Sequence, residues 1–287
     1  MEAQPFLKWA GGKSRLLSQY LPWFPKRVGT YFEPFLGGGA VFFWLRNRLG
    51  PFPARLSDVN RELIELYQVI QQRPQALVSR LRHYQGQHSE EFYYATREAR
   101  PRTRLERAAR MIYLNKTCFN GLYRVNSQGK FNVPMGRYKN PSILQEERIL
   151  AASSALQQCQ LVVSPYAQAV ASAEAGDLVY FDPPYQPLSA TSSFTSYTRD
   201  SFDHEDQRRL AEVVGMLVQR GCQVLLSNSD TPLIRQLYQA YPLVEIQAPR
   251  MINSKAERRQ PVGELLVIGS SFTGSAGPSS SVEKPRP

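Results

Sequence analysis

A short apolar run that ends in an acidic residue and two prolines is the strongest constraint on the fold of this chain. Leu178-Val179-Tyr180-Phe181 has the composition of a buried strand, and Asp182-Pro183-Pro184-Tyr185 follows it directly. The two prolines stiffen the turn behind the carboxylate, and the aromatic ring lies beside it. We therefore expect a buried strand that presents a carboxylate and a ring at its carboxyl end.

Other apolar runs alternate with helix patterns in the last part of the chain. Such alternation favours an α/β fold with a mostly parallel sheet that helices cover on both faces. The amino-terminal part predicts a strand, a glycine turn, a helix and a second strand that ends at Asp58. The predicted strands are 30–32, 54–57, 160–163, 178–181, 223–226 and 265–269, and the predicted helices around them are 41–49, 204–220 and 232–239.

The middle of the chain has a different pattern. It predicts amphipathic helices at 62–72 and 74–84, a basic helix at 102–114, and a β-hairpin over 120–134 with arms at 122–125 and 130–133. Alternation in the hairpin puts Leu122 and Arg124 on faces that a nucleic-acid groove could contact. We predict one domain from residues 1–60 and 149–272, a second domain inserted at 61–148, and a disordered Gly/Ser/Pro-rich tail at 273–287.

Positive charge is concentrated in the first half of the chain. Residues 61–148 hold 16 Lys+Arg against 8 Asp+Glu, residues 1–60 hold 8 against 3, and residues 149–287 hold 11 against 13. This distribution is typical of a protein that lays one part against a phosphate backbone. On charge alone, a soluble protein with a solvated basic face is an equally good interpretation.

The remaining composition argues against several classes of protein. The three cysteines and three histidines are scattered, which fits neither a disulfide framework nor a metal site, so we expect reduced thiols and no metal. The sequence has no apolar run of membrane-spanning length and no secretory signal at its start, so we expect a cytoplasmic protein.

The motif at 182–185 suits an exocyclic amino group on a flat ring. Asp182 and the Pro183 carbonyl can accept hydrogen bonds from an NH2 group, which leaves the nitrogen lone pair free to attack, while Tyr185 stacks on the heterocycle. The alternative is a strand followed by a merely structural Pro-rich turn.

A glycine turn at 37–39 and the acidic Asp58 together indicate a nucleotide-like cofactor. The turn does not match the dinucleotide fingerprint, and Gly12-Lys13-Ser14 lacks the first glycine of a phosphate-binding loop. With an amino group as the other reactant, S-adenosylmethionine is the preferred cofactor. The opening segment 6–13 supplies an aromatic residue and a lysine that could bind it, although a helix-start loop with a surface lysine explains that segment equally well.

Several motifs occur in a fixed order along the chain. They are Lys-Trp-Ala-Gly-Gly-Lys at 8–13, Phe-Glu-Pro-Phe-Leu-Gly-Gly-Gly-Ala at 32–40, Asp-Val-Asn at 58–60, Tyr-Leu-Asn-Lys at 113–116, Asn-Gly-Leu-Tyr-Arg at 120–124, Phe-Asn-Val-Pro-Met-Gly-Arg-Tyr-Lys at 131–139, Asp-Pro-Pro-Tyr at 182–185 and Ser-Asn at 227–228. Together they resemble the Dam family of DNA adenine-N6 methyltransferases (D12 class), and the resemblance covers about residues 5–270.

The resemblance implies a Rossmann-like methyltransferase sheet with an inserted, mainly helical target recognition domain that carries the hairpin. It implies a catalytic set of Asp182, Pro183, Pro184 and Tyr185, and cofactor contacts from Trp9, Lys13, Phe35, Gly37, Asp58 and Asp182. It implies DNA contacts from Lys8, Phe119, Asn120, Leu122, Arg124, Pro134, Arg137 and Lys139. Of these, Phe119 would enter the base stack, and Arg137 and Lys139 would contact phosphates. Ser164 is a departure, because relatives commonly have an acidic residue there that contacts the cofactor's adenine.

The expected activity is methyl transfer to N6 of an adenine that is flipped out of duplex DNA, within GATC by family likeness. We expect a monomer that acts on the nucleoid, with the loop 187–198 closing over the base. Alternatives are methylation of adenine in RNA or of N4 of cytosine, a DNA-binding module without activity, and, more distantly, a nucleotide hydrolase.

Overall fold

The computed structural model describes residues 1–186, 202–247 and 263–270 of the 287-residue chain. The predicted closing loop at 187–198 and the predicted tail at 273–287 lie outside these ranges. No helix in the described ranges is both long and apolar enough to cross a membrane.

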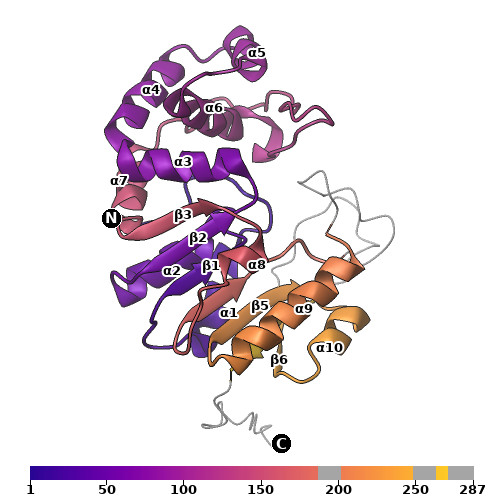
Figure 1. The fold of residues 1–287 in the computed structure, drawn as a ribbon. Coiled ribbons are helices and arrows are strands. Elements are labelled where there is room, and N and C mark those ends of the chain that lie inside the picture. Colours follow the sequence, from indigo (N-terminus) through magenta and orange to yellow (C-terminus); the bar gives the residue numbers. More distant parts are fainter. Residues whose placement is uncertain (187–201, 248–262, 271–287) are drawn as a thin grey trace, which may run out of the picture.

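A mixed sheet of seven described strands forms the centre of the molecule, in the order β3-β2-β1-β4-β5-β7-β6 (Figure 1). The first five strands in this order run parallel, and β7 runs antiparallel to both β5 and β6. The mostly parallel α/β sheet is thus confirmed, whereas β6 was not predicted. The strands are β1 (Tyr31–Glu33), β2 (Ala54–Asp58), β3 (Cys159–Val163), β4 (Leu178–Phe181), β5 (Gln223–Ser229), β6 (Leu243–Ile246) and β7 (Glu264–Gly269).

The strand order reverses between β1 and β4, and ligands of open α/β sheets bind outside the carboxyl ends of strands at such a point. The glycine turn leaves the carboxyl end of β1, and the segment 182–185 leaves the carboxyl end of β4. Asp58 ends the neighbouring strand β2 at the same edge. The sequence order of strands and helices therefore places three separate motifs along one edge.

Helices cover both faces of the sheet, and alternate strand residues enter two cores. The first core takes Tyr31, Leu56 and Tyr180 from the strands and packs them against α1 (Leu17–Tyr20), α2 (Ala40–Leu49), α3 (Arg61–Gln72) and α7 (Glu146–Ala155). The second takes Phe32, Val179 and Phe181 and packs them against α8 (Tyr166–Ala169), α9 (His204–Gln219) and α10 (Pro232–Leu237). The described residues also form three short 3-10 helices: η1 (Lys13–Arg15), η2 (Leu21–Trp23) and η3 (Phe119–Gly121).

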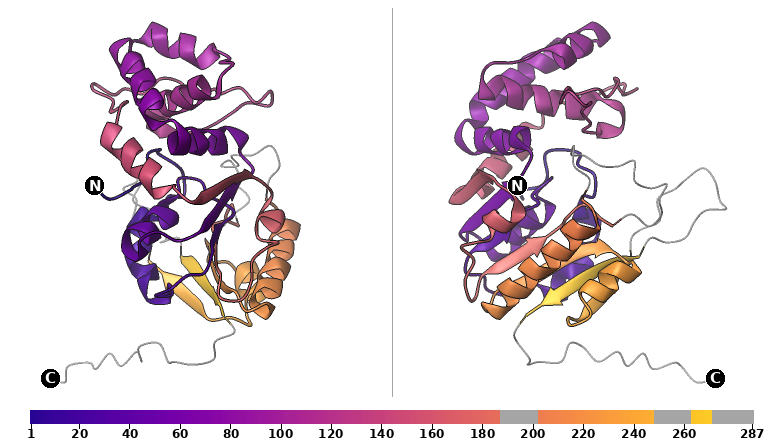
Figure 2. Two further views of the ribbon diagram at one scale, coloured as in Figure 1. Left: turned by 60° about the vertical axis from the view of Figure 1, so that its left-hand side comes forward. Right: turned by 45° about the vertical axis from the view of Figure 1, so that its right-hand side comes forward.

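Five α-helices, α3 to α7, separate β2 from β3 in the sequence, although these two strands are neighbours in the sheet. α3 lies against the sheet, where the Gln71 side chain donates to the carbonyls of Leu156 and Cys159 at 2.7 and 2.9 Å. The helices α4 (Pro74–Gly86), α5 (Glu90–Glu98) and α6 (Arg104–Thr117) lie farther from the sheet (Figures 1 and 2). The predicted domain boundary between residues 148 and 149 falls inside α7. The division of the chain into domains stays a prediction.

The predicted hairpin at 120–134 is shorter than expected. Its two arms meet in one isolated antiparallel bridge, Val125 to Phe131, instead of two paired strands. The turn itself is well formed, because the Asn126 side chain accepts from the backbone N–H groups of Gln128 and Lys130 at 3.0 Å each. The turn at Asn120 and Gly121, directly before the first arm, has positive φ angles of 55° and 66°. This left-handed backbone is incompatible with a strand.

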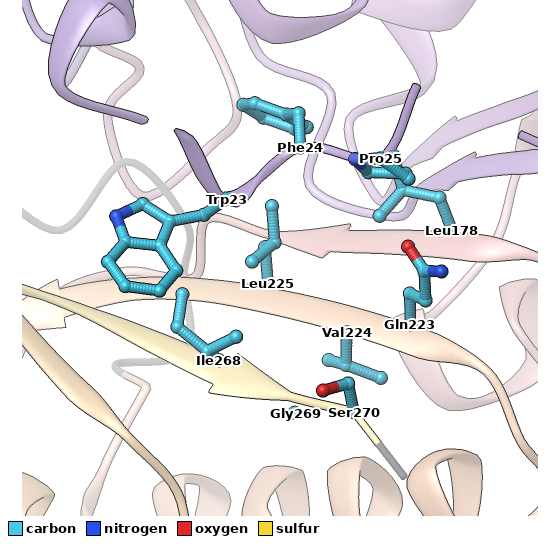
Figure 3. Close-up of a pocket in the computed structure, with 10 residues that line it drawn as sticks. All are labelled: Trp23, Phe24, Pro25, Leu178, Gln223, Val224, Leu225, Ile268, Gly269 and Ser270. Atoms are coloured by element: carbon cyan, nitrogen blue, oxygen red, sulfur yellow. The ribbon is translucent and has the colours of Figure 1, made fainter. Parts of the chain in front are cut away.

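A cavity of about 190 Å³ lies between the 23–25 segment and the sheet (Figure 3). Leu178 and Gln223, which line it, are the first residues of β4 and β5. The cavity is therefore at the amino ends of these strands, and Asp182 is at the opposite edge. Its position argues against a role in the chemistry of Asp182.

Candidate functional site

The carboxylate of Asp182 lies beside a buried lysine at the end of β4. The Lys13 ammonium is 2.8 Å from Asp182 Oδ1 and donates to the Gly11 carbonyl at 2.7 Å, and the Lys13 side chain is only 5% exposed. The same ammonium lies 4.8 Å from the centroid of the Tyr185 ring, within the range of a cation–π contact. The structure thus brings together three residues that are predicted to act on the cofactor and on the base.

The turn after Asp182 is held by side chains on the face of the sheet that packs into the second core. Gln207 on α9 donates to the Pro184 carbonyl at 3.1 Å, and the Asn228 side chain donates to Gln207 Oε1 at 3.0 Å. Asn228 Oδ1 accepts the backbone N–H of Gln186 at 3.2 Å. In the described residues, no donor reaches the Pro183 carbonyl.

Two further buried carboxylates, Glu33 and Glu264, lie close to this cluster. Burial raises the pKa of Glu33 to about 8, although Tyr31 donates a hydrogen bond to it at 2.9 Å. Burial also raises the pKa of Glu264, which accepts a hydrogen bond from the Tyr20 hydroxyl, and the charge of Lys13 opposes that rise. The sequence analysis missed both residues. The position of Glu33 at the end of β1 is a signal that could have identified it.

The glycine turn after β1 is joined to the end of β2. Asp58 accepts from the backbone N–H groups of Gly37 at 3.1 Å and Asn60 at 2.9 Å, while burial raises the pKa of its carboxyl group. Gly37 has a φ of 47°, and a Cβ atom there would lie 2.9 Å from Trp9 Cδ1. Only glycine allows this approach, which brings Trp9 against the turn.

Phe35 lies on the other side of the glycine turn. Its ring stacks on Tyr166 with centroids 5.4 Å apart and meets the edge of Phe202 at 6.0 Å. Ser164, the departure from the family pattern, is 6% exposed, and its hydroxyl donates to the Pro165 carbonyl at 3.2 Å. The Ser164 hydroxyl is thus bonded to the backbone of the next residue.

The residues predicted to contact DNA are mostly exposed. Phe119 is 51% exposed, and its backbone N–H donates to the Pro134 carbonyl at 2.9 Å, so these two residues are adjacent. The Arg124 guanidinium donates to Asn132 Oδ1 at 2.8 Å within the hairpin. Leu122 is half-buried, while Lys8, Asn120, Arg124, Pro134, Arg137 and Lys139 are exposed.

One asparagine connects the amino-terminal segment to the middle of the chain. Asn115 accepts from the Lys8 N–H at 2.8 Å and donates to the carbonyls of Lys8 at 2.7 Å and Gly121 at 3.0 Å. Next to it, the rings of Trp9 and Tyr123 stack with centroids 5.4 Å apart. The Tyr-Leu-Asn-Lys motif is thus a structural connection between predicted cofactor and DNA residues.

A basic cavity of about 270 Å³ opens beside Lys8. Lys116 and Arg148 also line it, and Lys116 donates to Gln145 Oε1 at 2.8 Å. Burial and the neighbouring cations Arg148 and Lys8 lower the pKa of Lys116 to about 8. Neither Lys116 nor Arg148 was predicted as a site residue. Lys116 ends the Tyr-Leu-Asn-Lys motif at 113–116, which is a signal that could have identified it, whereas Arg148 belongs to no motif.

Comparison with known proteins gives a consistent result. Residues 9–252 match the family described as D12 class N6 adenine-specific DNA methyltransferase. A Type II methyltransferase, M1.LlaDCHI of Lactococcus lactis subsp. cremoris, is 42% identical over 92% of this chain and 94% of its own length. The Type II methyltransferase M.MjaIII of Methanocaldococcus jannaschii is 39% identical over 93% of this chain and 99% of its own. The DNA adenine methylase of Escherichia coli K12 is 40% identical over 92% of this chain and 94% of its own.

The family match covers the glycine turn, Asp58 and the segment 182–185, which lie at the edge of the sheet described above, and it also covers the middle helices. With a matched range of this length and relatives at about 40% identity, the chain belongs to the D12 class of N6 adenine-specific DNA methyltransferases.

Proposed function

We propose that this enzyme transfers the methyl group of S-adenosylmethionine to N6 of an adenine that is flipped out of a GATC site in duplex DNA. The observation that carries the proposal is the meeting of Asp182, Lys13 and Tyr185 at the carboxyl end of β4, next to the glycine turn of β1. Two strands at the reversal point would supply one binding site each, for the base and for the cofactor.

The residues of the glycine turn fit the proposed cofactor. Asp58 already accepts two backbone N–H groups, and a carboxylate has further lone pairs for ribose hydroxyls. The approach of Trp9 to Gly37 leaves an aromatic wall over the turn. When bound, S-adenosylmethionine would supply a methyl group on a positively charged sulfur.

At the base, Asp182 and the Pro183 carbonyl would accept the two hydrogens of the adenine amino group. This arrangement would direct the nitrogen lone pair at the methyl group, so that the N–C bond forms as the C–S bond breaks, without a covalent enzyme intermediate. The sulfur would leave as a neutral thioether, and the nitrogen would then lose one proton. The Tyr185 ring would stack on the extruded base, because a paired adenine cannot reach this edge of the sheet.

The middle segment 61–148 would recognise the DNA. Its exposed Phe119 and Pro134 are adjacent, which suits insertion next to a base step, while Arg124 at the hairpin suits a base edge. The cations that line the cavity at Lys8, Lys116 and Arg148, together with Arg137 and Lys139, suit phosphates.

We infer the GATC site from the likeness at 120–139 and from relatives named DNA adenine methylase. Other relatives are named Type II methyltransferases, so a place beside a restriction enzyme is a second setting for the same reaction. We further propose that the enzyme acts as a monomer on chromosomal DNA in the cytoplasm.

The direct test incubates the purified protein with unmethylated duplexes and S-adenosylmethionine labelled on the methyl group, and maps the product by sequencing. The expected result is N6-methyladenine in GATC and no label in a duplex in which that site is scrambled. Label on cytosine, or equal label in both duplexes, would contradict the proposal.

Base flipping is tested separately with 2-aminopurine in place of the target adenine. Its fluorescence should rise when protein and cofactor are added, unless stacking on Tyr185 quenches the probe. A target opposite an abasic site should bind more tightly, because unpairing then costs a few kcal/mol less.

A further inference from the structure

The two oxygens of the Asp182 carboxylate have different surroundings. Oδ1 receives the Lys13 ammonium at 2.8 Å and the Ser227 hydroxyl at 2.9 Å. No hydrogen bond to Oδ2 comes from any residue in the described part of the chain, and the Asp182 side chain is 21% exposed. Among the described residues, one oxygen thus accepts two donors and the other accepts none.

This asymmetry matters because the last torsion of an aspartate side chain is broad and roughly two-fold. A carboxylate that rotates freely would present either oxygen, at varying angles, to an amino group. Lys13 alone cannot prevent this rotation, because an ammonium is a point charge on a flexible stem without directional preference between the two oxygens.

Ser227 fixes the orientation of the Asp182 carboxylate. It lies in the central strand β5, is fully buried, and follows Leu226, the register partner of Phe181. Its hydroxyl has a single hydrogen, and Asp182 Oδ1 at 2.9 Å is closer than the Phe181 carbonyl at 3.4 Å. The carboxylate can only accept, so the serine donates to it.

Tyr180 lies behind the serine and fixes its orientation. The Tyr180 hydroxyl is 2.9 Å from Ser227 Oγ, and because the serine hydrogen goes to Asp182, the tyrosine must donate. Tyr180 and Asp182 are two residues apart, so their side chains leave the strand on the same face. Tyr180 is completely buried.

We propose that Ser227 is a positioning residue, oriented by Tyr180, that holds Asp182 so that Oδ2 faces the amino group of the base. The inference rests on the proposed function and adds a role for the serine of the Ser-Asn motif. The N–C bond would form as the C–S bond breaks, the sulfur would leave as a neutral thioether, and the amino nitrogen would release one proton to water. Ser227 and Tyr180 hold their protons throughout.

The test measures the single-turnover rate constant of methyl transfer together with the binding constants for cofactor and DNA. Ser227→Ala should lower the rate constant by about 10- to 100-fold, as expected for a misplaced reacting group, while both binding constants stay unchanged. Ser57→Ala is the matched control, because Ser57 is an equally buried serine in β2 whose hydroxyl has no partner among the described residues. It should keep the wild-type rate.

A double-mutant cycle separates positioning from general loss of structure. Tyr180→Phe alone should lower the rate constant by less than Ser227→Ala does, and it should have no further effect when Ala already stands at 227. Independent, multiplying effects would overturn the proposal. So would a wild-type rate in Ser227→Ala, or a fall in rate matched by weaker cofactor binding.

A second variant and the activity of the wild type distinguish a folding defect from a failure of the proposal. If Ser227→Ala does not fold, Ser227→Thr keeps the hydroxyl and should retain the wild-type rate while Tyr180→Phe lowers it; a wild-type rate in Tyr180→Phe would then overturn the proposal. If the wild-type enzyme fails to methylate adenine in this assay, the proposed function fails. If the wild type is active and Ser227→Ala equals it, only the positioning role fails.

Discussion

The edge of the sheet at Asp182 and the outer surface of the middle segment differ in how their polar groups are satisfied. At the edge, Lys13, Ser227 and Asn228 are buried and already make hydrogen bonds or ion pairs within the chain. On the outer surface, Phe119 is half exposed, and the exposed Lys139 has no hydrogen bond or ion pair with the described residues. The first region is organised before a ligand arrives, whereas the second is completed by its ligand.

This difference predicts two kinds of mutational effect. A change at the organised edge should reduce the rate and spare affinity, because the groups there are proposed to act on reacting atoms. A change on the open surface should reduce affinity or discrimination and spare the rate once DNA is bound.

The largest effect is expected from Asp182→Ala. Loss of one preorganised polar group typically costs a factor of about 100 to 1000 in rate, whereas DNA binding should be largely retained. Single-turnover methylation and a DNA titration on the same protein measure the two quantities. Near-native turnover would contradict the assignment of the edge as the reaction centre.

Arg124→Ala should act on discrimination. A bidentate contact to a base is worth roughly 1 to 3 kcal/mol, so binding to the cognate site should approach binding to a site altered at one base pair. Titrations against duplexes that each change one pair of GATC locate the contact. Equal loss on every duplex would make Arg124 a phosphate contact.

Lys139→Ala should weaken binding to all sequences by a smaller factor. If Lys139 neutralises one phosphate, the slope of log affinity against log salt should fall by about 0.9. Affinities at several salt concentrations, on cognate and scrambled duplexes, give this slope. An unchanged slope would remove Lys139 from the phosphate-binding surface.

Glu33→Gln tests whether the Glu33 carboxyl group is protonated in the folded protein. An acid whose pKa is raised on folding, here from 4.5 to about 8, lowers stability as the pH rises between these values, because the folded state holds the proton more tightly. The wild type should therefore lose melting temperature between pH 5 and pH 8 more steeply than Glu33→Gln. Parallel melting curves for the two proteins would mean that Glu33 is ionised in the fold.

Tyr185→Phe should have the smallest effect. The substitution removes only a buried hydroxyl and keeps the ring for stacking. Tyr185→Ala is the contrast, and it should lose turnover through poor positioning of the base. Equal turnover of all three proteins would argue against stacking.

The sequence predicted those features that depend on local pattern and on strand direction. The apolar run of β4 and the acidic ends of β2 and β4 were readable, and parallel strands then bring their carboxyl ends to one edge. The pairing of Tyr20 with Glu264 was not readable, because 244 residues separate them and neither belongs to a motif. The short hairpin arms were also missed, because the positive φ of Asn120 has no reliable sequence signal.

The hydrogen bonds of Asn115 have a thermodynamic consequence. Lys8 faces the proposed DNA side, Trp9 packs on the glycine turn of the proposed cofactor site, and Asn115 fixes the backbone between them to Gly121. An ordering of this segment by either ligand lowers the entropic cost of binding the other. Such coupling is reciprocal, so the factor by which cognate DNA raises cofactor affinity must equal the factor by which the cofactor raises DNA affinity.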